Sequence, residues 1–314
     1  MMFKTWSALL LGIAAVSNVA SPVKAAAWKM QTDLNCPDPT IQHDGSNWWT
    51  FCTGPGIQVL MSPDGNSWKR IKPVFPEGLP WWNREVPDHK DTNVWAPDVS
   101  NYNGKTYLYY SISTPGSRTS AIGVAVADSI TAGNWKDQGL VLKTTNEKNN
   151  YNAIDPNLVL DLKKKPWLVF GSFFDGIKIT PIDPKTMKPT GKIHSIARRE
   201  AGIEGAILTH HGDYWYLFAS IDRCCKGLDS NYKIVVSRAK KIAGPYTDAD
   251  GKSAMEGGGT IVYAGDRDEI IAPGGQDVFD NKVIAYHYYN KHKDARTLRV
   301  NDLYWKEDGW PTFG

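Results

Sequence analysis

The sequence contains no long amphipathic segment with a 3.6-residue period, which excludes a mainly helical fold. After its N-terminal leader it also has no run near the roughly 18 apolar residues that a membrane helix needs, so we expect no membrane attachment once the leader is removed. Excess charge is lacking as well: removing Lys4 and Lys24 with the leader lowers the formal net charge from +3 to +1. A nearly neutral surface gives no reason to expect nucleic acid as a partner.

The first 27 residues have the pattern of a secretory signal peptide. Lys4 precedes an apolar stretch, 6–20, and small residues follow it. This order is typical of a leader that is cleaved, and we place the cleavage within 25–27. Residues 28–314 are expected to form a single exported domain, secreted or periplasmic, because all-β folds of this size are often single domains. This domain is expected to act as a monomer.

Cysteine is scarce, with four in the whole chain. In an exported protein these suggest disulfides, with three possible connectivities. Cys36 and Cys52 lie symmetrically about the turn at 43–45, so an antiparallel hairpin would place them opposite each other, and we expect that bond. Cys224 and Cys225 are adjacent, and the sequence does not decide whether they bond to each other or stay reduced.

Aromatic residues are abundant (13 Trp, 14 Tyr and 9 Phe), and one pattern recurs five times. Each copy has an acidic or Gly-rich start, a short apolar strand, a polar turn and an aromatic strand, as a β-hairpin does. The copies occupy 38–51, 97–110, 155–170, 204–218 and, more weakly, 275–286. Their starts lie about 50 to 70 residues apart, near the spacing of propeller repeats. We predict an all-β, five-bladed β-propeller. The alternative is a β-sandwich or a β-helix, but a sandwich does not need one motif five times.

Acidic residues stand at the repeat starts. The first strand of each propeller blade lines the central axis, so Asp38, Asp98, Asp155 and Glu204 are expected to converge at one end of it. Like charges held close together resist simultaneous ionisation, so at least one pKa must rise. Glycoside hydrolysis uses such a set, because it needs one protonated carboxyl and one carboxylate. Acids before Pro or Gly can also be simple turn formers, but their recurrence at repeat starts favours catalysis.

A series of short motifs runs along nearly the whole mature chain. They are Asp38–Ile41, Trp95–Val99, Ser120–Gly123, Tyr151–Asn157, Phe170–Phe173, Glu204-Gly205, Cys224–Gly227, Tyr232–Ile234, Gly257–Thr260, Pro273–Gln276 and Gly309–Pro311. In this order they resemble glycoside hydrolase family 43, and within it the endo-1,5-α-L-arabinanases. Two positions depart from the family pattern. Pro37 precedes Asp38 where many relatives have His, and Ala206 follows Gly205 where Pro is usual.

The resemblance implies an inverting hydrolase that acts on arabinan or arabino-oligosaccharides. It implies Asp38 as general base, Glu204 as general acid, and Asp155 as the residue that raises the pKa of the acid and orients it. Since inversion leaves room for a water, the carboxyls of Asp38 and Glu204 should stand roughly 6.5 to 9.5 Å apart. Asp98 is interpreted as a structural, hydrogen-bonding carboxylate.

Other positions are candidates for sugar and ion contacts. Trp95 either offers an apolar face to a furanose ring or belongs to the core, and Ser172 and Phe173 resemble substrate-contacting positions. The resemblance also implies an ion such as Ca2+ in the central channel, with His287 as the candidate ligand and Gln276 where some relatives carry His. Calcium prefers roughly six to eight oxygens, so water and nearby carboxylates would have to complete the shell. No organic cofactor is expected.

Two other functions are considered. An exo-acting α-L-arabinofuranosidase or β-xylosidase of the same family would keep the three carboxyls and differ in its loops. The segment 81–89, with two Trp and several charged residues, is interpreted as a loop over the cleft that could block one end and favour exo action. The Cys224-Cys225 motif and the glycines at 257–259 favour an endo-arabinanase. A non-catalytic sugar-binding propeller should have lost a catalytic carboxyl, and all three are present.

Overall fold

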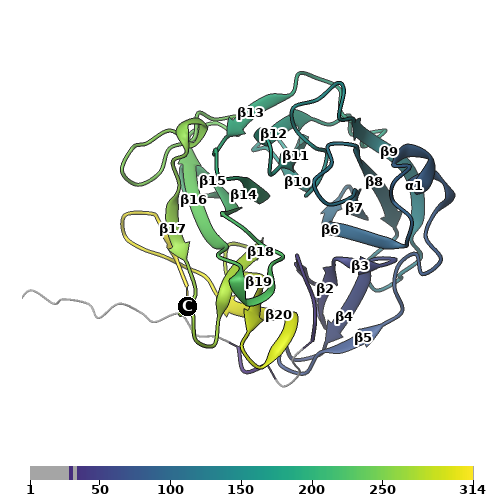
Figure 1. Cartoon of the computed structure of the whole chain (residues 1–314), viewed down its shortest axis with the longest axis horizontal. Coiled ribbons are helices and arrows are strands. Elements are labelled where there is room, and N and C mark those ends of the chain that lie inside the picture. The colour runs from purple at the N-terminus through teal and green to yellow at the C-terminus, as the bar shows by residue number, and fades with distance from the viewer. Residues whose placement is uncertain (1–27, 31–33, 314) are drawn as a thin grey trace, which may run out of the picture.

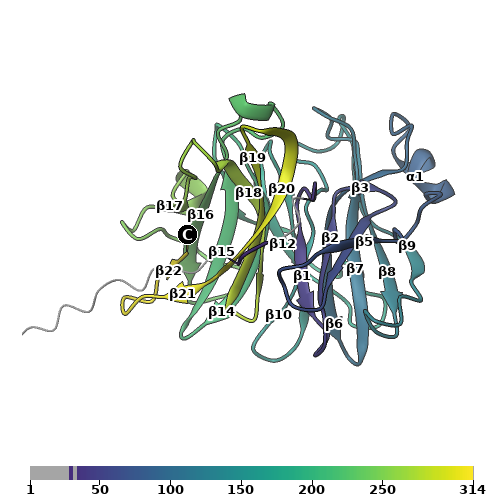
Figure 2. The same cartoon turned by 90° about the horizontal axis from the view of Figure 1, so that it is seen from below.

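The computed structural model describes residues 28–30 and 34–313, and the proposed signal peptide at 1–27 lies outside them. The described residues form antiparallel sheets arranged as five blades around a central axis (Figure 1). Figure 2 shows the blades edge-on, with many of their strands running roughly along that axis. The five-bladed propeller predicted from the repeats is confirmed.

Each blade is built from consecutive strands, and the first strands of neighbouring blades contact one another around the axis. The first blade contains β1 (Thr40–His43), β2 (Trp48–Cys52), β4 (Gln58–Ser62) and β5 (Lys69–Ile71). The second contains β6 (Asn93–Tyr102), β7 (Lys105–Ile112), β8 (Ser120–Ala127) and β9 (Lys136–Thr144), with the short β3 (Gly54–Pro55) bonded to β6. The third contains β10 (Asn157–Leu160), β11 (Pro166–Ser172), β12 (Gly176–Pro181) and β13 (His194–Ala197).

The remaining blades follow the same order. The fourth contains β14 (Ile203–His211), β15 (Tyr214–Ile221), β16 (Lys233–Ala239) and β17 (Thr260–Tyr263). The fifth contains β18 (Ile271–Phe279), β19 (Val283–Asn290) and β20 (Lys293–Asp302). The smaller elements are α1 (Pro80–Glu85), the 3-10 turns η1 (Gly227–Asp229) and η2 (Ala254–Glu256), and the pair β21 (Tyr304–Trp305) and β22 (Pro311–Thr312).

Hydrophobic side chains fill the space between neighbouring blades. Each of the five interfaces between blades has its own cluster of buried residues. Because side chains alternate along a strand, one strand supplies two clusters. In β8, Val124 packs between the second and third blades, whereas Ala125 packs between the first and second. Inner strands with two buried faces therefore have nearly continuous apolar sequences, as the aromatic repeats do.

The N-terminal segment completes the fifth blade. The amide of Cys36 donates to the carbonyl of Arg296 in β20 at 2.8 Å, and the amide of Leu298 donates to the carbonyl of Leu34 at 3.2 Å. Cys36 also forms a disulfide with Cys52 at the end of β2, with 5.1 Å between their Cα atoms. This pairing confirms the bond expected from the hairpin. The disulfide links the segment that closes the ring to the first blade.

Cys224 and Cys225 form a second disulfide, between neighbours in the chain. Cys225 has a positive φ angle of 65°, and Cys224 packs against the cluster formed by Tyr232, Ile271, Ala272 and Tyr289. The question that the sequence left undecided is therefore answered: these two cysteines bond to each other, and their loop packs beside β18 and β19.

The segment 81–89, interpreted as a loop over the cleft, has both of its Trp side chains in the core. Its first residues form α1, in which Trp81 and Trp82 are only 8% and 1% exposed and join the cluster between the first and second blades. The Trp81 indole also donates to Asp137. The expectation that these aromatic side chains are available to sugars is therefore wrong. In the described part of the chain, no helix is long and apolar enough to cross a membrane.

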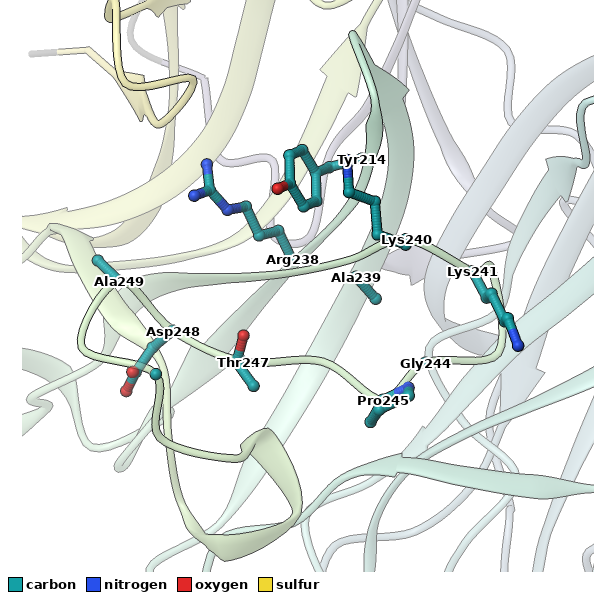
Figure 3. Close-up of a pocket in the computed structure, with 11 residues that line it drawn as sticks. Tyr214, Arg238, Ala239, Lys240, Lys241, Gly244, Pro245, Thr247, Asp248 and Ala249 are labelled. Carbon is teal, nitrogen blue, oxygen red and sulfur yellow. The ribbon is translucent and has the colours of Figure 1, made fainter.

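A hollow of about 470 Å³ lies on the fourth blade (Figure 3). Tyr214 contributes an aromatic ring to the wall of this hollow, but two cationic side chains of the protein already lie over that ring. The Arg238 guanidinium lies 4.4 Å and the Lys240 ammonium 3.9 Å from its centroid. The lining contains none of the site residues expected from the sequence.

Candidate active site

The chain turns sharply at one end of the axis in every blade. One residue per blade there has a positive φ angle, between 41° and 59°: Asp38, Ala96, Asp155, Gly205 and Gly275. For a residue other than glycine such a backbone costs roughly 1–3 kcal/mol and persists only where the surroundings enforce it, often at functional sites. Two of these turning residues carry carboxyls.

The enforcing contacts come from the second strand of the preceding blade. The N–H groups of four turning residues donate to Oγ1 of Thr53 (from Ala96, 2.8 Å), Oγ of Ser111 (from Asp155, 2.9 Å), Oγ of Ser220 (from Gly275, 2.9 Å) and Nδ1 of His287 (from Asp38, 3.1 Å). Gly205 differs, because its N–H donates to Oδ2 of Asp155 at 2.9 Å. The fold therefore fixes one carboxyl directly against the backbone of the next blade.

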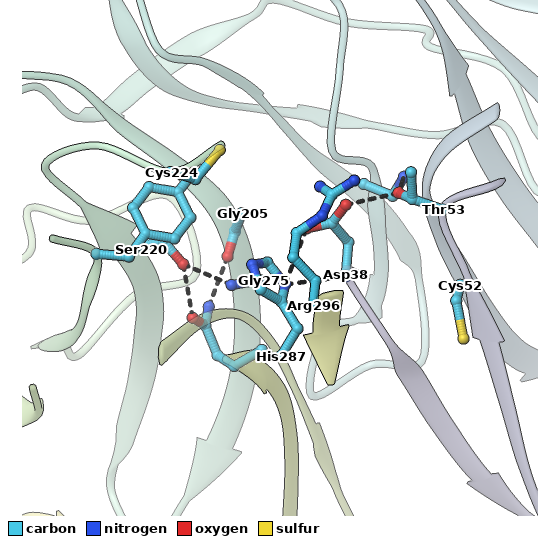
Figure 4. Close-up of polar contacts among 12 residues, drawn as sticks. Asp38, Cys52, Thr53, Gly205, Ser220, Cys224, Gly275, His287 and Arg296 are labelled. Carbon is cyan, nitrogen blue, oxygen red and sulfur yellow. Dashed lines mark hydrogen bonds and ion pairs between the residues drawn. The ribbon is translucent and has the colours of Figure 1, made fainter. Parts of the chain in front are cut away.

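Asp38 lies just before β1 and is held by the first and fifth blades (Figure 4). Its Oδ2 accepts a hydrogen bond from Oγ1 of Thr53 at 2.6 Å, and its Oδ1 lies 3.3 Å from Nδ1 of His287. Burial raises the pKa of Asp38, but the hydrogen bond and charge of His287, the charge of Arg296 and the Thr53 hydroxyl together lower that pKa to about 2. Asp38 is therefore a carboxylate near neutral pH, as a general base must be.

Asp155 and Glu204 belong to neighbouring blades and influence each other. Glu204, in β14, directly precedes Gly205, which donates to Asp155. Burial and then the charge of Asp38 raise the pKa of Asp155 to about 7. Burial, the charge of Asp155 and the charge of Asp38 raise the pKa of Glu204 well above its ordinary value. The site thus keeps Asp38 ionised and favours a protonated Glu204. The two pKa values move apart, so Asp38 can act as a base and Glu204 as an acid.

Gly275 lies between Asp38 and the backbone that follows Glu204. A Cβ atom at Gly275 would lie 2.5 Å from Oδ1 of Asp38, and a Cβ atom at Gly205 would lie 3.6 Å from the Cα of Gly275. Only a residue without a side chain fits in this gap. The structure therefore brings Asp38, Asp155 and Glu204 together at one end of the axis. All three are partly accessible to solvent, so a substrate can reach them.

Asp98 does not join this set, although the sequence placed it among the converging repeat starts. Proline follows the turning residue in three blades, and these residues are Pro39, Pro97 and Pro156. Aligning the blades on proline matches Asp38 with Ala96, so Asp98 lies two positions further along its strand. The expectation that Asp98 faces the same space as the other carboxyls is therefore wrong.

Asp98 instead connects blades below the site. It is 3% exposed and accepts hydrogen bonds from Nδ2 of Asn157 and the amide of Leu158, both at 2.9 Å. Asp277 plays the same part in the fifth blade, where its Oδ2 accepts from the Thr40 hydroxyl at 2.9 Å. Burial and then the charge of Asp277 raise the pKa of Asp98 to about 7. The interpretation of Asp98 as a structural, hydrogen-bonding carboxylate is confirmed.

Trp95 lies at the same end of the axis as the carboxyls. It is half-buried and stands opposite Ser111, whose hydroxyl accepts from the amide of Asp155. The next residue, Ala96, donates to Thr53, which in turn donates to Asp38. Trp95 is therefore linked to Asp155 through Ser111 and to Asp38 through Ala96 and Thr53. Contact between Trp95 and a sugar stays a prediction.

Ser172 ends β11, the second strand of the third blade, and Phe173 follows it; the two differ in accessibility. Ser172 is fully buried, and its hydroxyl donates to Oδ1 of Asn152 at 2.6 Å and accepts from the amide of Phe174 at 3.2 Å. Phe173 is 38% exposed and lies where a Cβ on Gly202 would be 2.2 Å from its ring. The ring of Phe173 is thus partly open to solvent, whereas the hydroxyl of Ser172 is fully used within the loop. Their substrate contacts stay predictions.

His287 and Gln276 are both buried near the axis. Nδ1 of His287 faces Asp38, while its Nε2 is buried and has no hydrogen-bond partner in the protein. Both ends of the Gln276 amide are occupied, because Oε1 accepts from Ser220 at 2.9 Å and Nε2 donates to the Gly205 carbonyl at 2.6 Å. Among residues 28–30 and 34–313, no group of three or more His, Cys, Asp or Glu side chains is arranged to hold a metal.

The described chain matches one known family over almost its whole length: residues 32–311 match the glycosyl hydrolases of family 43. The chain belongs to glycoside hydrolase family 43. A Bacillus subtilis relative, named an extracellular endo-α-(1→5)-L-arabinanase, is 44% identical over 324 residues, which cover 99% of each chain. A Cellvibrio japonicus relative, named an extracellular exo-α-(1→5)-L-arabinofuranosidase, is 33% identical and covers 90% of this chain and 86% of its own.

Solved structures agree with this family assignment. The structure of a family 43 endo-arabinanase from Bacillus licheniformis has 47% sequence identity and a TM-score of 0.88, covering 91% of this chain and all of that one. The resemblance drawn from the short motifs is therefore confirmed, and the chain is a member of a glycoside hydrolase family.

Sequence reasoning gave no role to three residues of this family 43 site. Thr53 donates to Asp38, Arg296 contributes charge beside Asp38, and the Tyr232 phenol donates to Oε1 of Glu204. Four repeats have a small hydroxyl residue near the end of the aromatic strand, and this recurrence could have indicated a role for Thr53. The four residues are Thr53, Ser111, Ser172 and Ser220. Tyr232 lay in a matching motif, but its partner Glu204 is 28 residues away, and local patterning cannot pair them.

Proposed function

We propose that this chain is an exported, inverting endo-1,5-α-L-arabinanase that hydrolyses α-1,5-linked L-arabinofuranose in arabinan. The observation that carries the proposal is the set of three partly accessible carboxyls at one end of the axis, with the pKa of Asp38 lowered and that of Glu204 raised. Acid and base roles follow from pKa values that the environment moves apart. The substrate follows from the family 43 relatives, which are named arabinanases.

In the proposed reaction, Glu204 gives its proton to the glycosidic oxygen as the bond from the anomeric carbon to that oxygen breaks. Asp38 takes a proton from a water whose oxygen bonds to the anomeric carbon from the opposite face. The product sugar then has inverted configuration, and no covalent sugar–enzyme intermediate forms. Asp155 raises the pKa of Glu204 and holds the backbone beside it. The separation expected between the carboxyls of Asp38 and Glu204 stays a prediction.

An exo-acting enzyme is the second candidate, because the Cellvibrio japonicus relative is named as exo-acting. Endo action is favoured because the Bacillus subtilis relative is named as endo-acting and matches more closely. In addition, Trp81 and Trp82 pack in the core, which removes part of the segment invoked to block one end of the cleft.

Product analysis separates these two modes. On linear α-1,5-arabinan we expect arabino-oligosaccharides of several lengths to appear from the first minutes, with a rapid fall in viscosity. Chromatography of early time points measures this distribution. A single short product throughout, with viscosity falling only in proportion to the bonds cut, would establish exo action instead.

We further propose that His287 holds a hydrated cation such as Ca2+ in the central channel. Its buried Nε2 has no hydrogen-bond partner in the protein. To bind an ion, Nε2 must carry no proton, so the ring proton would reside on Nδ1 and face Oδ1 of Asp38 at 3.3 Å, and Nδ1 would no longer accept from the Asp38 amide. The remaining ligands would be mostly waters, since no group of three or more His, Cys, Asp or Glu side chains in the described chain is arranged to hold a metal. Bound there, the ion would add positive charge beside Asp38. The assignment of Gln276 as a ligand stays a prediction.

Cation binding should raise stability, because a ligand that binds only the folded state shifts the unfolding equilibrium. We expect EDTA to lower the unfolding midpoint by roughly 5 °C and excess CaCl2 to restore it. His287→Gln should abolish this response. His89→Gln, which removes another buried imidazole whose Nε2 has no hydrogen bond and lies 3.7 Å from Asp91, should keep this response. Calorimetry in both conditions makes the measurement, and equal responses of both variants would exclude His287 as the ligand.

Export is proposed on the N-terminal pattern, on the two disulfides, and on the Bacillus subtilis relative, which is named as extracellular. Disulfides persist mainly in oxidising compartments. The choice between periplasm and medium, and the expectation that the enzyme acts as a monomer, stay predictions.

A further inference from the structure

Tyr232 makes a direct contact with the proposed acid. It lies just before β16 and is 4% exposed, and its phenol donates a hydrogen bond to Oε1 of Glu204. The strand register agrees with this placement, since Glu204 lies opposite Ser220 and the neighbouring Ile221 lies opposite Lys233. The contact therefore follows from the sheet geometry of the fourth blade.

The surroundings fix the ring of Tyr232 in this position. A Cβ atom on Gly274 would lie 2.3 Å from the ring, so that position admits no side chain. Tyr232 shares a buried cluster with Ile271, Ala272 and Tyr289, and Cys224 of the adjacent-cysteine disulfide packs against that cluster. A phenol held this firmly constrains its partner, because a hydrogen bond transmits its geometry only when the donor is fixed.

A protonated carboxyl has one oxygen that carries the proton and one that only accepts. Oε1 of Glu204 accepts the hydrogen bond from the phenol, and the carbonyl oxygen is the stronger acceptor of a protonated carboxyl, which places the acid proton on Oε2. We infer that Tyr232 is a positioning residue for the general acid: it selects Oε1 as the acceptor and thereby presents Oε2–H to the glycosidic oxygen. This inference rests on the proposed function of Glu204 as the acid.

The phenol of Tyr232 also acts on the pKa of Glu204, in the direction opposite to the neighbouring carboxylates. Asp155 and Asp38 face Glu204 and disfavour its ionisation, while His287 and Arg296 act on Asp38. A phenol that donates to a carboxyl favours the ionised form. Removing the phenol should therefore raise the pKa of Glu204, although the same change makes the acid less well oriented.

The test compares Tyr232→Phe with Tyr246→Phe, which removes a buried phenol that donates to the carbonyl of Ile242 at 2.7 Å. Tyr232→Phe should lower kcat on linear arabinan about tenfold with KM nearly unchanged, and should move the alkaline limb of the pH profile upward by about one unit. Hydrolysis of an arabinotrioside with a 2,4-dinitrophenyl leaving group should change little, since that group departs without protonation. Tyr246→Phe should change none of these.

A titration independent of activity separates failure of this inference from failure of the proposed function. In protein labelled with 13C at the glutamate carboxyls, the Glu204 resonance is assigned by its absence in Glu204→Gln, and its titration midpoint should be higher in Tyr232→Phe. If this midpoint rises but wild type does not cut arabinan, the proposed function is wrong and Tyr232 still contacts Glu204. If arabinan is cut but neither the midpoint nor the pH limb moves, or both substrates lose activity equally, Tyr232 does not position the acid.

Discussion

Replacing Glu204 with glutamine is expected to lower kcat on linear arabinan about a thousandfold, because glutamine keeps the shape of the side chain and has no acidic proton to give. The loss should depend on the leaving group. In an arabinotrioside with a 2,4-dinitrophenyl leaving group, the dinitrophenolate departs without protonation, so hydrolysis of this substrate should fall far less. Initial rates on the two substrates, measured on the same preparation, give the comparison.

Two matched variants define what this result means. Glu200→Gln changes an exposed glutamate four residues away and should leave both rates unchanged. Asp38→Asn should reduce both rates strongly, because either substrate requires an activated water. If Glu204→Gln lost the same factor on both substrates, Glu204 would have a role other than proton donation.

Replacing Asp155 with asparagine is expected to reduce kcat/KM on arabinan about a hundredfold at pH 7. The charge of Asp155 helps to keep the proton on Glu204. Without it the pKa of Glu204 falls, so the acid is lost at lower pH and the alkaline limb of the pH profile moves downward. This direction is opposite to that expected for Tyr232→Phe. The pH dependence of kcat/KM measures both.

The fold should survive the change at Asp155. An asparagine carbonyl can still accept from the amide of Gly205, which now donates to Oδ2 of Asp155 at 2.9 Å. Asp161→Asn is the control, since Asp161 follows the same strand, β10, at its other end. A shift of the alkaline limb to lower pH in Asp155→Asn but not in Asp161→Asn supports the electrostatic role of Asp155. An unshifted limb with lowered activity would make Asp155 a purely structural residue.

The blade number was predictable from the sequence because each blade repeats the same local requirement, a polar turn beside an apolar strand. The position of Asp98 was not assigned correctly, because the repeats were aligned on acidic residues. Alignment on the prolines after Asp38, Ala96 and Asp155 gives the register that the structure shows, since proline marks the turning residue. The prolines in the sequence therefore indicate the register of the repeats, whereas the acidic residues do not.

Other features require three-dimensional structure. Trp81 and Trp82 have the composition of a sugar-binding loop, yet burial between blades uses the same aromatic side chains. The contact between Tyr232 and Glu204 joins two strands through a third, β15. Hairpin symmetry predicted the bond between Cys36 and Cys52, but the pairing of Leu34–Cys36 with β20 has no local signal.

That pairing determines when the site can exist. The amide of Arg296 is bonded to Asn35 across 261 residues of sequence, and Asp38 takes its amide acceptor from β19 and part of its charge environment from β20. A fragment that ends before these strands would contain Asp38, Asp155 and Glu204 and still lack the groups that keep Asp38 ionised. Asp38, the first of these three carboxylates to be synthesised, thus becomes a competent base only after the last blade has been made.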